Sequence, residues 1–239
     1  REEDDLDEDR EQDEKIAKLS RPLFVYIAYS DLLSASACDG RGDYEQGARF
    51  IQAYADLGWV KEQDEEAENW KKLYLEWAAS NACLNKLMAG DIGVLPEYVQ
   101  YIAQCEEDIF VDLINVIEAA MRHNIDVDNI IERFAQKAMD SWQREADDVY
   151  TSQVLPEQVS RYWYKLAQYK FIRGAYSYGF KCLIYSLEIS SKINHRTLII
   201  KSMGLYEQFR TFSDNEVQAQ YNTIRDKENE KDGFFLCDY

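Results

Sequence analysis

The chain contains few of the residues that interrupt regular structure, with only three prolines and ten glycines among 239 residues. A β-sandwich needs a turn about every 8–12 residues, and those turns are usually built from glycine and proline. The scarcity of both residues excludes that class. No run of about 18 apolar residues occurs either, so no membrane span is expected, and the acidic beginning does not resemble a signal peptide.

Residues suited to catalysis and metal binding are equally scarce. There are two histidines and five cysteines, and no two cysteines form a CxxC motif. An odd, scattered set of cysteines indicates reduced thiols in a cytoplasmic protein. Neither histidine belongs to an HExxH or ExxH motif, and no glycine-rich phosphate loop is present. We therefore expect no cofactor, no bound metal and no enzymatic activity.

Acidic residues outnumber basic residues by 45 to 27, which gives a net charge of −18. Residues 1–14 hold ten acids and two arginines and so carry −8, which leaves −10 on the other 225 residues. A net charge of −10 on these 225 residues repels phosphate groups, which disfavours direct contact with nucleic acid or with an anionic membrane. We interpret residues 1–15 as an acidic, disordered leader or linker and residues 16–232 as the folded domain.

Hydrophobic residues recur with the period of an α-helix. In the segments 109–121 and 156–173, bulky apolar residues fall on one face at spacings of three and four, and no sustained two-residue alternation appears. A hydrophobic fraction of 46% is ample for a core. The pattern predicts ten helices, over 16–39, 43–57, 64–89, 96–104, 107–123, 127–144, 156–173, 176–193, 196–211 and 213–230.

The predicted helix boundaries rest on prolines and capping residues. All three prolines suit the first turn of a helix, where a missing N–H costs nothing. They are Pro22, Pro96 and Pro156. Asp43, Asp126 and Ser213 are predicted N-caps. The connections are short, which predicts antiparallel hairpins, except that residues 145–155 are expected to form one longer connection.

Two of the predicted helices begin with the same pattern. Residues 42–47 (GDYEQG) and 174–179 (GAYSYG) each start with glycine, with tyrosine two positions later and another glycine five positions later. A small residue at that last point lets two helices approach closely, and this opening is typical of the second helix of a tetratricopeptide repeat. The predicted fold is all-α, with antiparallel helical hairpins stacked as a degenerate tetratricopeptide-like superhelical array. The apolar segment 233–239 is predicted to be a tail that folds back over the last hairpin or occupies a groove of its own or another chain.

Stacked helical hairpins form a concave groove, and polar side chains on its face are candidates for ligand binding. Trp77, Asn81 and Asn85 recur every four residues. An asparagine side chain can form hydrogen bonds with both the N–H and the C=O of an extended peptide backbone. The alternative is that Trp77 is a core residue and both asparagines are ordinary surface residues. Arg161 can hold a peptide carboxylate, or else forms an ion pair with a neighbouring helix. The predicted groove residues are Tyr29, Trp77, Asn81, Asn85, Arg161, Tyr164 and Gln168.

Several short stretches resemble a known family. They are Gly42-Asp43-Tyr44-Glu45, Tyr54-Ala55-Asp56-Leu57-Gly58-Trp59-Val60, Gly90-Asp91, Leu95-Pro96-Glu97-Tyr98-Val99, Ile131-Glu132-Arg133-Phe134 and Gly204-Leu205-Tyr206-Glu207-Gln208-Phe209-Arg210. They are similar to the C-terminal region of XRE-type helix-turn-helix transcription regulators of spore-forming Firmicutes, over roughly residues 20–230. The resemblance implies tetratricopeptide-like repeats that bind a short signalling peptide and mediate dimerisation. It also implies a DNA-binding domain, which we expect ahead of Arg1 because this chain contains no helix-turn-helix.

These observations lead to one preferred function and two alternatives. The preferred function is the ligand-sensing, homodimeric repeat domain of a cytoplasmic bacterial transcription regulator, which binds a short peptide or protein segment and reaches DNA only through the missing domain. The first alternative is a protein–protein scaffold of the same fold with no link to DNA. The second is an all-α enzyme whose site is assembled from distant residues. A helix-turn-helix encoded upstream of Arg1 would favour the regulator over the scaffold.

Overall fold

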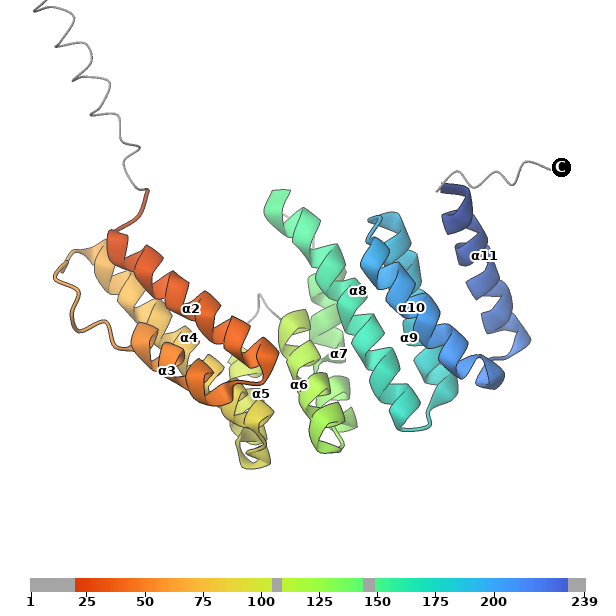
Figure 1. The fold of residues 1–239 in the computed structure, drawn as a ribbon, viewed down its shortest axis with the longest axis horizontal. Helices are drawn as coiled ribbons and strands as arrows, with labels where there is room; N and C mark the ends of the chain where they lie inside the picture. Colours follow the sequence, from red (N-terminus) through yellow and green to blue (C-terminus); the bar gives the residue numbers. More distant parts are fainter. Residues whose placement is uncertain (1–19, 105–108, 144–148, 232–239) are drawn as a thin grey trace, which may run out of the picture. The chain divides into compact units, whose positions relative to one another are not determined.

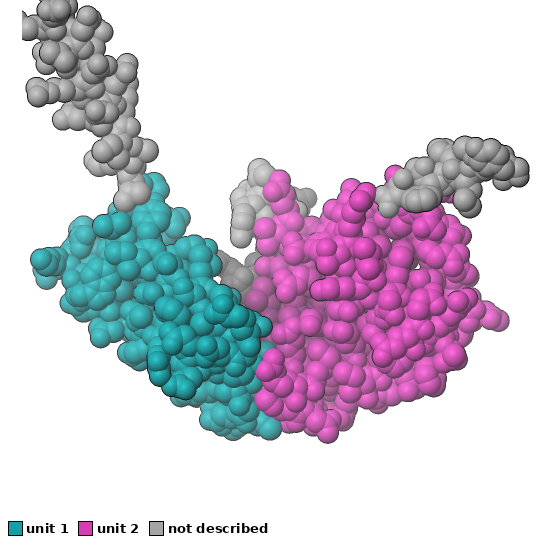
Figure 2. All heavy atoms as spheres, in the orientation of Figure 1, with its two compact units in different colours: residues 1–94 teal, residues 95–239 magenta. Residues whose placement is uncertain are grey.

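The structure, a computed structural model, describes residues 20–104, 109–143 and 149–231. Helices account for 86% of these residues and no strand occurs among them, so the all-α prediction is confirmed. Within the described ranges, none of the helices combines the length and the apolar character that a bilayer span requires. Contacts between the helices divide the chain into two compact units, residues 1–94 and 95–239, whereas the sequence suggested one domain over 16–232 (Figure 2).

Unit 1 is built from three long helices and a short 3₁₀ turn (Figure 1). Its elements are α2 (Leu23–Arg41), α3 (Tyr44–Ala55), α4 (Glu65–Ala89) and η1 (Ile92–Val94). The helices α2 and α3 form a hairpin, and α4 packs on both of them. Tyr54 and Tyr74 lie at the centre of this unit, with their ring centroids 6.1 Å apart. The buried hydroxyl of Tyr74 donates to the carbonyl oxygen of Val25 at 2.8 Å, so this large polar side chain is satisfied inside the core.

Unit 2 contains the remaining helices. They are α5 (Leu95–Gln104), α6 (Ile109–His123), α7 (Asp128–Gln143), α8 (Val149–Ile172), α9 (Tyr176–Lys192), α10 (Arg196–Phe209), η2 (Arg210–Phe212) and α11 (Asn215–Lys231). The helix α8 contacts α6 and α9, and α9 contacts α10 and α11 (Figure 1). Lys137 of α7 donates to the carbonyl oxygens of Ile102 and Ala103 at 3.0 and 3.3 Å, which satisfies acceptors at the C-terminal end of α5.

The repeated sequence pattern produces the same local geometry in both units. Gly42 and Gly174 lie just after α2 and α8 with φ of 77° and 75°, a left-handed conformation that ends a helix and strongly favours glycine. A Cβ added to Gly47 would lie 2.5 Å from a carboxylate oxygen of Asp39, and one added to Gly179 would lie 2.6 Å from the ring of Phe171. The prediction that these two glycines allow close helix contact is therefore confirmed.

Buried serines mark the contact between α8, α9 and α10. The side chains of Ser160, Ser186, Ser190 and Ser202 are each 0% exposed. Ser160 Oγ lies 2.6 Å from Ser190 Oγ, and Ser186 Oγ donates to the carbonyl oxygen of Ser160 at 2.9 Å. Because serine is small and these hydroxyls find partners, the helices approach closely without leaving unsatisfied polar groups.

Some predicted boundaries are wrong. The helix α2 begins at Leu23 with Pro22 as its N-cap, so it does not begin at residue 16; residues 16–19 lie outside the described residues. Pro156 lies inside α8, which already begins at Val149. A proline inside a helix removes one N–H donor and its ring crowds the carbonyl four residues earlier, yet α8 continues through Pro156. The proline was therefore a poor boundary signal here.

Two of the three predicted N-caps differ from the structure. The side chain of Asp43 accepts the backbone N–H of Gln46, as expected for the cap of α3. Ser213 does not cap α11, because the neighbouring Asp214 accepts the N–H of Val217 at 2.9 Å. Asp126 accepts the N–H of Asp128, the first residue of α7, and so lies one residue ahead of the N-cap position. Adjacent polar residues have similar capping propensities, so the sequence alone does not choose between them.

Candidate functional site

A cavity of about 380 Å³ lies between α7 and α8 in unit 2, and α6 and α9 contribute to its walls. Its lining is mainly aliphatic and aromatic and includes three charged side chains. The lining residues are Phe110, Asp128, Ile131, Glu132, Ala135, Ala138, Met139, Trp142, Val159, Tyr162, Trp163, Lys170 and Tyr178. We refer to this space as the α7–α8 cavity.

Interlocked aromatic rings of α8 form one wall of the α7–α8 cavity. The ring centroids of Tyr162 and Trp163 are 5.2 Å apart, and Tyr162 packs edge-on against Phe110 of α6 at 5.5 Å. Trp163 also contacts Tyr185 of α9, at 5.3 Å. Aromatic pairs in such tilted arrangements are attractive beyond their buried area. The wall is therefore held from both sides, by α6 and by α9.

An ion pair lies in the lining of the cavity. The ammonium of Lys170 donates to Oδ1 of Asp128 at 2.7 Å, and the lysine side chain is only 11% exposed. The same ammonium lies 5.4 Å from the ring centroid of Tyr169 and 5.2 Å from that of Tyr178. A buried cation is costly unless it is paired. The carboxylate and the two aromatic faces supply that compensation, so the charge of Lys170 is already balanced.

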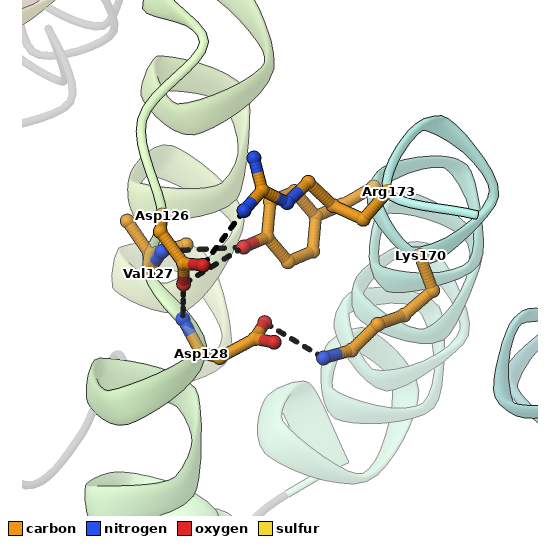
Figure 3. A network of polar contacts seen from close by, with 6 residues as sticks. Asp126, Val127, Asp128, Lys170 and Arg173 are labelled. Carbon is orange, nitrogen blue, oxygen red and sulfur yellow. Dashed lines mark hydrogen bonds and ion pairs between the residues drawn. The ribbon is translucent and has the colours of Figure 1, made fainter. Parts of the chain in front are cut away.

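A second set of contacts attaches the start of α7 to the end of α8, as Figure 3 shows. Arg173 donates to Oδ2 of Asp126 at 2.7 Å, and Oδ1 of Asp126 accepts the backbone N–H of Asp128 at 2.9 Å. The hydroxyl of Tyr169 accepts the N–H of Val127 at 3.2 Å. The pKa of Asp126 is lowered, chiefly by the N–H of Asp128 and further by the guanidinium of Arg173. These contacts position Asp128 at the cavity.

Other polar groups of the lining remain available to a ligand. The hydroxyl of Tyr162 makes no hydrogen bond, and Glu132 makes no ion pair, with any residue that the structure describes. Burial raises the pKa of Tyr162, so its hydroxyl stays protonated near neutral pH and can donate. The Cys182 thiol of α9 does not line the cavity, and burial raises its pKa to about 12, which leaves it unreactive. The polar groups of the lining are therefore suited to binding, and this thiol is not an activated nucleophile.

The two asparagines predicted to face a groove make hydrogen bonds within unit 1. Nδ2 of Asn85 donates to Oδ1 of Asp39 at 2.7 Å and to the carbonyl oxygen of Tyr44 at 3.1 Å, and the residue is 5% exposed. Nδ2 of Asn81 donates to the hydroxyl of Tyr54 at 2.8 Å. In this structure both amides therefore join α4 to α2 and α3.

The aromatic groove candidates of unit 1 reach the surface. Trp77 is 38% exposed and packs edge-on against Tyr74, with ring centroids 5.4 Å apart. Tyr29 of α2 is half exposed. Trp77 is therefore neither a fully buried core residue nor a free surface side chain, and a groove role for these two residues stays a prediction.

The candidates on α8 lie on the face of that helix opposite to the cavity. Arg161 is exposed, whereas Tyr164 and Gln168 are partly buried. Nε2 of Gln168 donates to the hydroxyl of Tyr164 at 3.2 Å, while its Oε1 is buried and has no partner within the described part of the chain. None of the seven predicted groove residues lines the α7–α8 cavity.

Sequence reasoning missed the cavity because its lining belongs to helix faces whose spacing is typical of a core. Glu132, Ala135, Met139 and Trp142 follow one another at spacings of three and four along α7. That pattern predicts burial but does not distinguish a face packed against another helix from a face that lines a void. The one feature of the sequence that could have indicated the cavity was the length of this row of residues, which continues to Trp142 near the end of the helix.

Comparisons with protein-family models, with curated proteins and with solved structures gave no match for this chain. Among the described residues, no three histidine, cysteine, aspartate or glutamate side chains are grouped so that they could hold a metal ion. The functional interpretation of the chain therefore rests on the chemistry of its own residues.

Proposed function

We propose that the α7–α8 cavity binds one apolar side chain of a short peptide or protein segment. The observation that carries this proposal is the cavity itself, which has rigid aromatic walls and polar groups without partners at its lining. Its volume of about 380 Å³ lies within the range of roughly 300–1,000 Å³ that is usual for ligand pockets. A large aliphatic or aromatic side chain fits such a space.

The charges of the lining indicate which peptides are suitable. Asp128 and Glu132 are acidic and Lys170 is basic, and the pairing of Lys170 with Asp128 leaves the carboxylate of Glu132 uncompensated. The chain as a whole carries −18. An anionic peptide is repelled by the carboxylate of Glu132 and by the net charge of the chain, so a neutral or basic segment is favoured.

We further propose that this domain is the sensing part of a cytoplasmic bacterial transcription regulator, as its sequence resemblance implies. Two hairpins with the same glycine geometry support a tetratricopeptide-like array, in which neighbouring hairpins present a shared binding surface. A ligand that wedges between α7 and α8 favours one spacing of these helices over another. The resulting population shift would change the position of an attached DNA-binding domain.

Tryptophan fluorescence tests the binding proposal directly, because Trp142 and Trp163 line the cavity. The probes are hexapeptides with a neutral or basic sequence and a central leucine or phenylalanine, compared with the same peptides carrying aspartate there. Ala135→Trp fills the cavity from its exposed edge and abolishes binding of the apolar peptides. Ala219→Trp on α11 is the matched control, because Ala219 is also an exposed helical alanine.

Two results would contradict the proposal. Equal binding of apolar peptides by the Ala135→Trp and Ala219→Trp variants would show that the cavity is not the binding site. Loss of binding in Arg161→Ala, with Ala135→Trp unaffected, would place the site on the opposite face of α8.

A further inference from the structure

The outer face of α2 carries a row of exposed apolar side chains. Leu23, Tyr26, Ile27 and Leu33 are 60%, 40%, 43% and 51% exposed. They follow one another at spacings of three, one and six residues, so they share one face of α2, which we call the α2 face. The opposite side of the helix is buried against the rest of unit 1 through Phe24, Val25 and Ala28. A contiguous apolar surface of this kind marks an interaction site.

The α2 face carries no charge, although the chain as a whole carries −18. Asp31 lies about 100° around the helix from Ser30 and so flanks the face. Lys61 and Glu62, one charge of each sign, border its N-terminal end, where they line a hollow together with Leu23 and Ile27. Contact between two copies through most of this acidic chain would place like charges together. The α2 face is an area where two copies can meet without that repulsion. Together with the small residues that lie between the four apolar side chains on the same side of the helix, the α2 face comprises Leu23, Tyr26, Ile27, Ser30, Leu33, Ser34 and Ala37.

We propose that the α2 face binds the same face of a second copy of the chain, with the two α2 helices antiparallel about a two-fold axis at Ser30. Residues whose numbers add to 60 then lie opposite one another. A two-fold interface requires such self-complementarity, in which each pair occurs twice. The resulting pairs are Ser30 with Ser30, Ile27 with Leu33, Tyr26 with Ser34, and Leu23 with Ala37 of the other copy.

The sizes of the paired side chains fit close helix packing. The bulky Leu23 and Tyr26 face the small Ala37 and Ser34, and Ile27 meets Leu33 near the axis. Alternation of large and small residues allows the ridges of one helix to enter the grooves of the other. The hydroxyl of Ser34 already donates to the carbonyl oxygen of Ser30 at 2.8 Å, so burying it leaves no unsatisfied donor.

The flanking charge lies outside the contact in this register. Asp31 of each copy is about 100° around its helix from Ser30, so neither carboxylate is buried between the two α2 helices. The two-fold axis places both Asp31 residues on the same edge of the interface and both Tyr29 residues on the opposite edge.

This inference rests on the homodimer that the sequence resemblance implies for the proposed regulator and not on the α7–α8 cavity. The first experiment measures the mass of the full chain by sedimentation as a function of concentration. Leu33→Glu and Ile27→Glu each raise the dimer dissociation constant about 100-fold or more, because each change places two charges in the interface. Ile200→Glu on α10 is the matched control, since Ile200 is 69% exposed in unit 2, and it leaves the constant unchanged.

The second experiment tests the register by oxidative cross-linking. In the antiparallel arrangement Ser30→Cys meets itself and forms a disulfide-linked dimer, whereas Ala37→Cys faces Leu23 and does not. The unsubstituted chain, treated identically, reports any linkage through its own cysteines. A parallel dimer would link both variants, because every position would then meet itself.

Each contrary result has a distinct meaning. A chain that stays monomeric at about 100 µM overturns the inference and leaves peptide binding by the cavity intact. A dimer that is unaffected by Leu33→Glu and Ile27→Glu overturns it too, because another surface is then used. Cross-linking of Ala37→Cys as efficiently as Ser30→Cys rules out the antiparallel register. Circular dichroism of each variant verifies that it remains folded.

Discussion

The ammonium of Lys170 lies 2.7 Å from Oδ1 of Asp128, so a nearly buried cation of α8 is held by the first residue of α7. Asp128→Asn removes the countercharge and leaves the cation of Lys170 uncompensated. We expect it to lower the free energy of unfolding by about 1–3 kcal/mol. Lys170→Met removes the buried charge while keeping an apolar stem, and should cost less than Asp128→Asn. Urea denaturation of both variants measures the difference.

A control substitution tests whether the loss of stability is specific to the buried charge of Lys170. Lys181→Met alters an exposed lysine of α9 and is expected to leave stability within about 0.5 kcal/mol of the parent. If Lys170→Met proved more destabilising than Asp128→Asn, packing of the lysine stem would matter more to stability than the ion pair.

Gly179→Ala should destabilise unit 2, because its new Cβ would lie 2.6 Å from the ring of Phe171. Relieving that overlap requires the packed aromatic ring or the helix to move, which typically costs about 1–3 kcal/mol. Gly204→Ala is the opposite case, since its Cβ would meet no atom within 4 Å in α10. There the substitution should stabilise the chain by about 0.5–1 kcal/mol. Thermal unfolding of the two variants should therefore shift in opposite directions, and a shared direction would refute the close-contact explanation.

Asn85→Ala should destabilise unit 1 by about 1–3 kcal/mol, because Asp39 loses a hydrogen-bond donor in a partly buried position. Burial raises the pKa of Asp39, whereas the bond from Asn85 lowers it, so the substitution should raise that pKa further. Asn69→Ala is the control on the same helix, since Asn69 is exposed. Chemical denaturation should separate the two variants. Equal stabilities would mean that Asn85 is not a structural residue and is free to serve a ligand.

The folded chain should lose stability in alkaline solution. Burial raises the pKa of Cys182 to about 12 from an ordinary value of 9.0, although Lys170 acts in the opposite direction. Above pH 9.0 the thiol ionises in the unfolded chain but not in the folded one, so the unfolded state binds fewer protons and is favoured. The stability that the Cys182 thiol contributes is fully present below pH 9.0 and is lost as the pH rises towards 12.

The alkaline loss can be assigned to Cys182 with one variant. Between pH 8 and about pH 10.5 the parent should lose on the order of 2 kcal/mol through this group, measured as a change in the urea unfolding free energy. Cys182→Ala should show a smaller decrease over the same interval, whatever its stability at pH 8. Equal decreases in the two proteins would show that the thiol does not ionise on unfolding.

The helices and their close contacts could be predicted from the sequence because these features depend on local patterns. Gly174 ends α8, and Gly179 permits close approach of α9 to α8. Both roles follow from the short local pattern of residues 174–179. Pro156 shows where local reasoning fails, since a residue that favours helix starts lies in the interior of α8. Whether a helix continues through a proline depends on contacts made elsewhere in the fold.

The candidate site was less accessible to sequence reasoning than the fold. Asn81 and Asn85 have the chemistry to bind a peptide backbone, but a hydrogen-bonding side chain binds whichever partner the fold places nearby. For Asn85 those partners are Asp39 and the backbone of Tyr44, residues about forty positions away in the chain. The lining of the α7–α8 cavity could not be recognised for the converse reason, since its apolar residues have no individual chemistry that marks them.

The sequence by itself determined the helical class, the acidic charge and the two glycines at which helices approach closely, because each follows from composition or from local spacing. Only the tertiary structure decided which apolar residues border a void, which charges form pairs and which amides are occupied. Lys170 and Asp128 illustrate the division: their identities are local, but their contact joins two helices across 42 positions of sequence. Such long-range contacts depend on how whole helices pack, and packing is a property of many residues at once.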